Sequence, residues 1–334
     1  MKVCIHLEFS HFLGGFFYRK LGSGMLSSYR NQLEMVEKMG IDSVDEWDDS
    51  CDVFVANLVW LGTWWKVRHA RRMGKKIILW AHVTAEDFEE VFWFNKYLVP
   101  FVRKYLAYFY NLGDIVLCPS FYTKKIIEGY GIYPEKVIVQ SNGVDLNKFF
   151  PDRRLGVGIR KKYGFQGITA GMIGLVVPRK GIDTLISLAK KNSKFQFVWF
   201  GKIYSRLITK PVYREAPSNL RFFGYVEDAN AAFNSLDIFI FPSYEENQGM
   251  AILEAAAVGL PILVRDIPVY EGWLRHGENC LKAKNEAEFD MYLKMLIEDA
   301  EMRQRLGKEA HLLAEEHSLE TVRKKFESII KKAI

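Results

Sequence analysis

The sequence predicts an α/β protein built from two doubly wound parallel sheets. The chain has 334 residues, which is twice the usual length of one domain or more. Short β-branched and aromatic runs alternate with helical stretches along nearly all of it, and this alternation is typical of parallel sheets covered by helices. A composition of 49% hydrophobic and 26% charged residues excludes disordered and fibrous proteins.

The predicted elements follow one another in two groups. In the first, strands are predicted at residues 3–9, 52–58, 76–82, 114–119 and 136–140, and helices at 25–39 and 122–130. In the second, strands are predicted at 168–177, 195–201, 220–223, 237–242 and 260–264, and helices at 181–191 and 250–258. Sheets of this kind bind ligands at the carboxyl ends of their strands.

The two groups indicate two domains, with a polar and glycine-rich boundary near residues 146–165. We assign residues 1–150 to the first domain, 151–316 to the second, and 317–334 to a helix that returns to the first. Residues 1–145 carry 17 Lys and Arg against 17 Asp and Glu, whereas residues 146–334 carry 29 against 23. The net charge of +6 therefore belongs to the second part, and such an excess suits an anionic ligand.

The sequence shows no sign of secretion or of a membrane span. Its longest uncharged apolar stretch, residues 163–178, is short and rich in glycine, and the N-terminus begins with a strand rather than a signal peptide. The four cysteines are scattered, which indicates buried, reduced thiols without disulfides or zinc. We therefore expect a cytoplasmic protein.

The segment 237–254 carries the clearest chemical signal. It is predicted to run from a strand through an acidic loop into a helix, with Glu246 in the loop and Glu254 inside the helix. Free N–H groups at a helix start favour a phosphate, and the deeper carboxylate can accept hydrogen bonds from ribose or sugar hydroxyls. The alternative interpretation is that Glu245 and Glu246 are solvated loop charges and that Glu254 makes an ordinary surface contact.

Segment 237–262, with Asp266, Glu271 and HGENC at 276–280, resembles the donor-binding signature of retaining GT-B glycosyltransferases of the sucrose-synthase-like family. SNGVD at 141–145, FFGYV at 222–226 and KGID at 180–183 are similar to further motifs of that family, in the same order. The resemblance extends over nearly the whole chain. It implies two Rossmann-like domains facing a central cleft, an acceptor-binding one followed by a donor-binding one.

The resemblance also implies roles in the second domain. Glu254 would bind the ribose of a nucleotide diphosphate-sugar, and Lys180 would neutralise the diphosphate. Leu175 stands where the family has a phosphate-binding arginine, and Arg179 is either its substitute or a solvent-facing charge. Sugar hydroxyls would be held by Glu246 and by the backbone of Asn247, Gln248, Gly249 and Met250.

In the first domain, Gly22 and Gly24 precede a predicted helix, where they would let the backbone approach a diphosphate or acceptor. A plain turn is the alternative. His82 ends the third predicted strand, which is a position where ligands of a parallel sheet bind. The resemblance places a histidine there against the donor sugar, while a structural histidine is the alternative.

Aromatic residues gather in 88–110, where we predict a helix with two apolar stripes and a kink at Pro100. Six cations lie within residues 66–76, just after three tryptophans. Aromatic residues beside a basic run suit the surface of an anionic membrane, although a core helix beside a solvated basic helix explains them equally. The predicted acceptor or membrane residues are Trp64, Trp65, Arg68, Arg71, Arg72, Phe92 and Trp93.

HVTAEDF at 82–88 and the aromatic stretch after it resemble bacterial enzymes that glycosylate diacylglycerol or glucosyl-diacylglycerol. This likeness implies a retaining hexosyltransferase that uses UDP-glucose or UDP-galactose and a membrane (glyco)lipid acceptor, peripheral on the inner face of the membrane. His82, Glu246 and Lys180 would be its catalytic residues. The leaving phosphate would help to deprotonate the acceptor, and we expect neither a metal nor another cofactor.

Three other functions are compatible with parts of the sequence. A soluble sugar or polysaccharide acceptor would share every donor motif. A sugar-nucleotide epimerase has a related fold but needs acid and base groups that the sequence does not supply. A non-enzymatic membrane or nucleic-acid binder fits the pI of 8.9, yet no nucleic-acid motif accompanies the charge and the paired glutamates would have no role.

Overall fold

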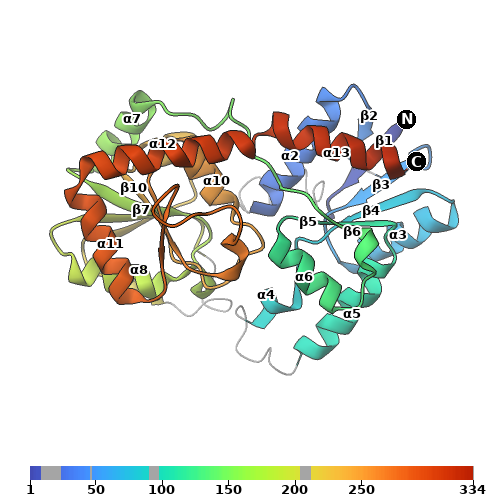
Figure 1. The fold of residues 1–334 in the computed structure, drawn as a ribbon, viewed down its shortest axis with the longest axis horizontal. Helices are drawn as coiled ribbons and strands as arrows, with labels where there is room; N and C mark the ends of the chain where they lie inside the picture. Colours follow the sequence, from blue (N-terminus) through green and yellow to red (C-terminus); the bar gives the residue numbers. More distant parts are fainter. Residues whose placement is uncertain (9–23, 46, 90–97, 204–211, 334) are drawn as a thin grey trace. The chain divides into compact units, whose positions relative to one another are not determined.

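The computed structural model describes residues 1–8, 24–45, 47–89, 98–203 and 212–333 (Figure 1). Gly22, Phe92 and Trp93 lie outside these ranges. The chain divides into two compact units, each described here by itself: unit 1 comprises 1–143 and 317–334, and unit 2 comprises 144–316. Each contains one parallel six-stranded sheet, so the α/β class with two doubly wound domains is confirmed.

The sheet of unit 1 has the strand order β2-β1-β3-β4-β5-β6. Its strands are β1 (Lys2–His6), β2 (Asp42–Val44), β3 (Val53–Ala56), β4 (Lys76–Trp80), β5 (Ile115–Cys118) and β6 (Val137–Val139). Four of them fall inside the predicted runs, and β1 begins one residue before its run. The sixth, β2, was not predicted, because it is a three-residue edge strand whose side chains are partly exposed and carry no alternating apolar pattern.

Helices cover both faces of this sheet, namely α2 (Gly24–Lys38), α3 (Leu61–Arg72), α4 (Ala85–Glu89), α5 (Val99–Asn111), α6 (Phe121–Gly129) and α13 (Leu319–Ala333), with a 3₁₀ turn at Pro134–Lys136. Alternate residues of β1 point to opposite faces. Val3 and Ile5 pack against α2 and α13, whereas Cys4 lies in the core formed with α3, α5 and α6. Figure 1 shows α2 and α13 side by side.

The predicted kink at Pro100 is wrong. Helix α5 begins at Val99, so Pro100 occupies its first turn. A proline is tolerated there because the first N–H groups of a helix have no intrahelical partner.

The sheet of unit 2 has the order β12-β11-β10-β7-β8-β9. Its strands are β7 (Thr169–Ile173), β8 (Gln196–Phe200), β9 (Leu220–Gly224), β10 (Ile238–Phe241), β11 (Ile262–Arg265) and β12 (Leu281–Ala283). Its helices are α7 (Arg153–Tyr163), α8 (Ile182–Lys191), α9 (Ala229–Asn234), α10 (Met250–Ala257), α11 (Glu286–Glu298) and α12 (Ala300–Glu316), with 3₁₀ turns at Pro178–Lys180, Val212–Glu215 and Pro268–Tyr270. The short edge strand β12 was not predicted.

The glycine-rich stretch taken as the domain boundary contains helix α7. The Asp152 carboxylate caps it by accepting a hydrogen bond from the Arg154 N–H at 2.9 Å. A Cβ at Gly156 would lie 2.0 Å from the Asn234 carbonyl oxygen, so this glycine lets α7 approach α9 closely. The division of the chain falls at 143/144, a few residues before the 150/151 boundary assigned from the sequence.

The four cysteines are buried free thiols, as expected. In the parts of the chain that the structure describes, no helix is both long enough and apolar enough to cross a bilayer. The same parts contain no group of three or more His, Cys, Asp or Glu side chains arranged to hold a metal ion.

Candidate active site

The loop between β10 and α10 lies at the carboxyl end of the central strands of unit 2. Gly249 ends it with φ of 91°, a left-handed conformation that glycine adopts without strain, and α10 begins at Met250. Glu246 in the loop and Glu254 in the helix are 6% and 8% exposed, so neither is a solvated surface charge. Asn247, Gln248 and Met250 complete the loop and the helix start. The first N–H groups of a helix have no intrahelical acceptor, which makes a helix start favourable for an anion.

A 3₁₀ turn, Pro178–Lys180, places two cations against this loop. Gly181 follows the turn with φ of 74°, and a Cβ there would lie 2.2 Å from the Pro242 carbonyl oxygen. The Tyr244 N–H donates to the Arg179 carbonyl at 2.9 Å. The glycine therefore permits the close contact that joins the cationic turn to the acidic loop.

The two cations converge on the Glu246 carboxylate. The Lys180 ammonium donates a hydrogen bond to Oε1, the Ser243 hydroxyl donates to the same oxygen at 2.7 Å, and Nη1 of Arg179 lies 3.7 Å from it. Burial alone would raise the pKa of Glu246. The charges of Lys180 and Arg179 and these hydrogen bonds outweigh it and lower the pKa, so Glu246 is a carboxylate at neutral pH.

Arg179 is not a solvent-facing charge. Its side chain is 19% exposed, and its guanidinium donates to the Glu245 carbonyl. The Lys180 side chain is 14% exposed, and its ammonium lies 4.8 Å from the centre of the Phe241 ring. Both cations are thus held by contacts besides those to Glu246.

Sequence reasoning missed the residue that ties this loop to α8. Arg265, the last residue of β11, donates to the Pro242 carbonyl at 3.0 Å and to the Thr184 hydroxyl at 2.7 Å, and its guanidinium lies 4.0 Å from the centre of the Tyr244 ring. The Tyr244 hydroxyl in turn donates to Asp183 at 2.7 Å. A single arginine at a strand end gives no sequence signal for such a role.

In unit 1, His82 lies just beyond β4 and faces a group of buried amides. Its Nε2 lies 3.1 Å from Oδ1 of Asn57, whose amide pairs reciprocally with that of Gln32. The ring stacks on Trp80 at 5.2 Å. Burial lowers the pKa of His82 to about 4, so the imidazole is neutral at physiological pH. Asn57 and Gln32 were not singled out from the sequence, and Gly24 is the exposed first residue of α2.

Helices α3 and α5 of unit 1 expose large apolar side chains. Trp65 is 64% exposed and Phe101 71%, and four further apolar side chains of this region are also exposed, namely Trp60, Leu61, Leu98 and Tyr108. The buried side of α3 consists of Thr63, Val67 and Ala70. The exposed tryptophan is therefore not part of the core.

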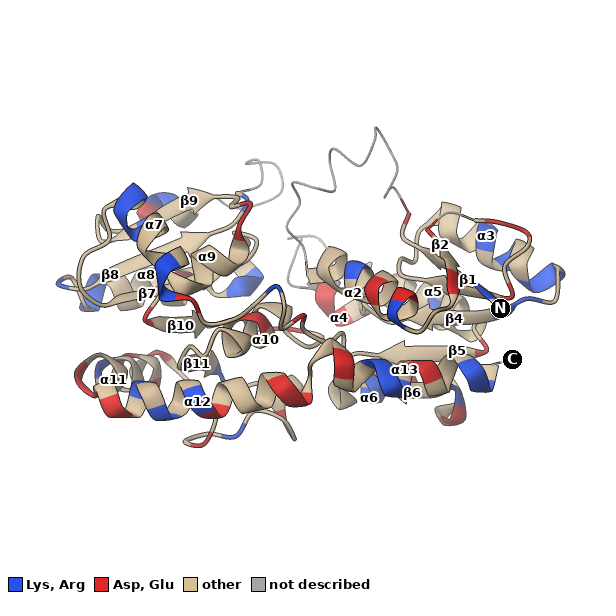
Figure 2. Ribbon diagram, turned by 90° about the horizontal axis from the view of Figure 1, so that it is seen from above, with Lys and Arg blue, Asp and Glu red and all other residues tan. Residues whose placement is uncertain are grey.

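Arginines of α3 connect these two helices. Arg68 donates to the Tyr108 hydroxyl at 3.1 Å, and its guanidinium lies 5.0 Å from the centre of the Trp64 ring. Arg71 donates to the Leu112 carbonyl at 2.8 Å, and Arg72 is exposed. Figure 2 shows Lys and Arg along α3. We call the exposed side chains of α3 and α5, together with these arginines, the α3–α5 face.

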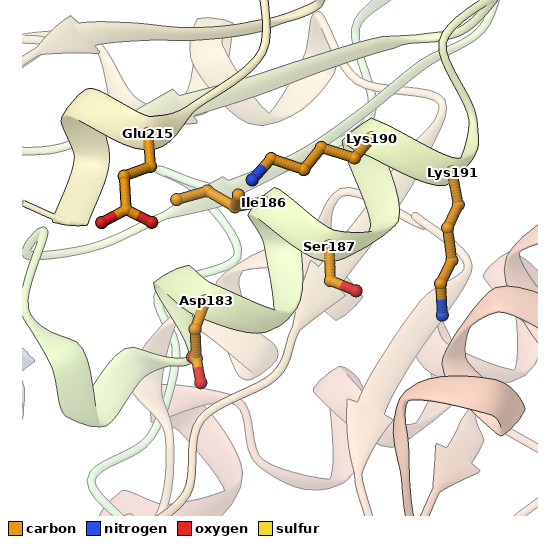
Figure 3. A pocket seen from close by; sticks show the side chains of 6 residues that line it. All are labelled: Asp183, Ile186, Ser187, Lys190, Lys191 and Glu215. Atoms are coloured by element: carbon orange, nitrogen blue, oxygen red, sulfur yellow. The ribbon is translucent and has the colours of Figure 1, made fainter.

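A pocket of about 400 Å³ lies beside α8 (Figure 3). Its lining residues come from α8 and from the turn at Val212–Glu215 and comprise Asp183, Ile186, Ser187, Lys190, Lys191 and Glu215. None of the predicted site residues lines it. Its link to the candidate site is Asp183, which accepts the Tyr244 hydrogen bond.

Comparison with known proteins identifies the family. Residues 159–312 match the model of the glycosyl transferases group 1, and residues 45–148 match that of glycosyltransferase family 4. A processive diacylglycerol alpha-glucosyltransferase of Acholeplasma laidlawii is 33% identical over 287 residues, covering 83% of this chain and 85% of the relative. An alpha-galactosylglucosyldiacylglycerol synthase of Streptococcus pneumoniae is 29% identical over 271 residues, covering 75% and 70%.

The chain therefore belongs to the group 1 glycosyltransferases. Its fold is the GT-B fold, which agrees with a solved structure of Anabaena HepE in complex with UDP-glucose. That structure aligns with a TM-score of 0.78 at 15% identity, covering 99% of this chain and all of HepE. The resemblance stated from the motifs, including the likeness to enzymes acting on diacylglycerol, is confirmed.

Proposed function

We propose that this glycosyltransferase moves a hexose from UDP-glucose or UDP-galactose, with retention of the anomeric configuration, to a hydroxyl of diacylglycerol or a glycolipid. The buried cluster of Arg179, Lys180 and Glu246 beside the start of α10 carries the proposal. Two desolvated cations next to a helix start suit a diphosphate, which is the leaving group of a nucleotide-sugar. The names of the two relatives support a lipid acceptor.

In the proposed reaction, Lys180 and Arg179 neutralise the charge that develops on the diphosphate as the bond to the anomeric carbon breaks. The backbone of residues 248–250 adds N–H donors, and Glu254 accepts hydrogen bonds from the ribose. The acceptor oxygen attacks from the face that the diphosphate leaves, and a phosphate oxygen takes its proton. These residues supply the charge in this scheme without a metal ion.

Glu246 and the backbone of Asn247 hold the hydroxyls of the donor sugar in this proposal. His82 also contacts the sugar. Because its pKa is lowered to about 4, its imidazole can form a hydrogen bond with a hydroxyl but brings no positive charge at neutral pH.

The α3–α5 face is the part of the molecule proposed to meet the acceptor membrane. Exposed Trp and Phe side chains suit the interface of a bilayer, and the arginines suit its anionic head groups. The enzyme would then be a peripheral protein on the inner face of the membrane. Neither a nucleic acid nor a resident cofactor enters this scheme.

Turnover with defined donors and acceptors tests the proposal. The purified chain is incubated with UDP-glucose, UDP-galactose and GDP-mannose, with EDTA, and with or without anionic vesicles containing diacylglycerol. We expect UDP release and an α-linked glycolipid, identified by mass spectrometry and NMR, only when vesicles are present. Failure to turn over any donor would contradict the transferase proposal, whereas turnover on soluble sugars without vesicles would favour the soluble-acceptor alternative.

A further inference from the structure

The proposed diphosphate site already contains an anion that belongs to the protein. The Glu246 carboxylate accepts a hydrogen bond from Lys180, lies 3.7 Å from Arg179, and accepts a second hydrogen bond from Ser243 at 2.7 Å. The Glu246 side chain is 8% exposed, and both cations are mostly buried. A nucleoside diphosphate that uses these cations must therefore compete with Glu246 for them.

The cations would stay in place when Glu246 leaves them. Arg179 also donates to the Glu245 carbonyl, and the Lys180 ammonium lies over the Phe241 ring. The turn that carries them is joined to the loop through the Tyr244 N–H and the contact of Gly181 with Pro242. Exchange of one anion for another thus requires movement of a carboxylate rather than rearrangement of the turn.

The hydrogen-bond partners available to Glu246 would differ between the bound donor, a nucleotide-sugar, and the bound product, a nucleoside diphosphate. A nucleotide-sugar offers hydroxyl donors that replace the hydrogen bonds lost from Lys180 and Ser243. A bare nucleoside diphosphate lacks the hydroxyls of the transferred sugar, and its ribose hydroxyls are bound by Glu254 in the proposed function. It therefore leaves Glu246 either buried without its cations or in competition for them, which is costly for a desolvated charge.

We propose that Glu246 is an internal competitor of the diphosphate and that this competition makes the site prefer nucleotide-sugar over the nucleotide product. This inference rests on the function proposed above. After transfer, Glu246 returns to Lys180 and Arg179 and so promotes release of the nucleotide. Glu246 is thereby a specificity-determining residue that recognises whether the sugar is still attached.

Calorimetric titration with UDP and with UDP-glucose tests this inference. Glu246→Gln keeps the shape of the side chain but removes the competing charge. We expect UDP to bind about tenfold more tightly than to the wild-type protein, which is the change expected when one charge-assisted competitor is lost. Binding of UDP-glucose should not strengthen in parallel, because the amide is a poorer acceptor for sugar hydroxyls. The preference for donor over product should therefore fall.

Two further variants complete the design. Glu245→Gln removes the neighbouring charge and should leave the UDP affinity within twofold of the wild-type value. Glu246→Asp keeps the charge on a shorter side chain and so weakens the contact with Lys180. It replaces Glu246→Gln in the titrations if the Gln variant does not fold. We expect it to bind UDP more tightly than the wild-type protein, by less than tenfold.

The outcomes separate this inference from the proposed function. Equal or weaker UDP binding by the Glu246 variants, with normal UDP binding by the wild-type protein, would overturn the internal competitor alone. Strengthening of UDP binding by Glu245→Gln to the same degree would also overturn it, because the effect would then reflect net charge. Absence of UDP binding to the wild-type protein would overturn both proposals.

Discussion

At the level of single residues, the chemistry of this chain depends on buried charged and titratable groups whose surroundings determine their state. Glu246 stays ionised because two cations surround it, whereas His82 stays neutral because it is buried among amides and an indole ring, and burial disfavours the charged imidazolium. The two groups lie in different units and provide opposite properties: a carboxylate that needs a partner, and an imidazole that carries no charge.

The lowered pKa of His82 predicts an acid-sensitive contribution to stability. The pKa falls from the usual 6.5 to about 4 in the folded state. Between these values the unfolded chain binds the proton and the folded chain does not, so the free energy of unfolding decreases as pH falls from 6.5 to 4. The difference amounts to about 3 kcal/mol.

Chemical denaturation of wild-type protein and of His82→Gln at pH 8, 6, 5 and 4 measures this contribution. The wild-type protein should lose about 3 kcal/mol more than the variant between pH 8 and pH 4. The values at pH 8, where both side chains are neutral, give the cost of the substitution itself. Parallel pH profiles for the two proteins would contradict the prediction.

At the level of elements, the sequence predicted the strands that stand in longer apolar or alternating runs and missed β2 and β12, two edge strands of three residues each. Strand β2 consists of Asp42, Ser43 and Val44 at the sheet edge, and its pairing with β1 rather than its own pattern makes it a strand. Helix α7 was missed because Gly156 and Gly158 lower its intrinsic propensity. The close approach of α7 to α9 requires Gly156, and this contact is a tertiary one.

In the candidate site too, local sequence patterns revealed some of the residues and not others. Lys180, Glu246 and Glu254 could be found because they occur in motifs at fixed spacing. Arg265, Asn57 and Gln32 could not, because each acts on a segment distant in sequence through hydrogen bonds that no local pattern reveals. For Arg179 the sequence allowed either a substitute for the family's phosphate-binding arginine or a solvent-facing charge. Its burial and its hydrogen bond to the Glu245 carbonyl exclude the solvent-facing charge.

The exposure of α3 and α5 predicts that these helices mediate membrane binding. Trp65 and Arg72 are exposed, so their substitution by alanine should leave the fold intact while removing an interfacial anchor and a cation. One cation near an anionic surface contributes about 1 kcal/mol, so Arg72→Ala should weaken vesicle binding about fivefold at low salt. We expect Trp65→Ala to weaken it at all salt concentrations.

Sedimentation with anionic vesicles at two ionic strengths measures these effects. Met291→Ala is the matched control, because Met291 is 48% exposed but lies on α11 of unit 2. It should bind vesicles like the wild-type protein. Unchanged binding by the α3 variants, or an equal loss in the control, would contradict a role for the α3–α5 face.

At the level of the whole molecule, each unit has a sheet of its own, but the chain does not divide at a single point. Helix α13 follows α12 directly in sequence and nevertheless completes the core of unit 1. Its buried side carries Leu319, Val322, Phe326, Ile329 and Ile330, which pack in the same core as the strand β1. The first and last segments of the sequence therefore stabilise the same unit.

Removal of residues 317–334 should consequently unfold unit 1 and spare unit 2. Each buried side chain of this size contributes about 1.5–3 kcal/mol, so the five together approach the whole stability of a typical domain. Hydrogen exchange followed by mass spectrometry should show loss of protection in β1 and β3, with β7 and β10 still protected.

Phe326→Ala should weaken protection in unit 1 by about 3–5 kcal/mol. Lys324→Ala, on the exposed side of α13, should leave it unchanged. Equal loss of protection in both units would show that they unfold as one, and full protection in the truncated chain would show that α13 is dispensable.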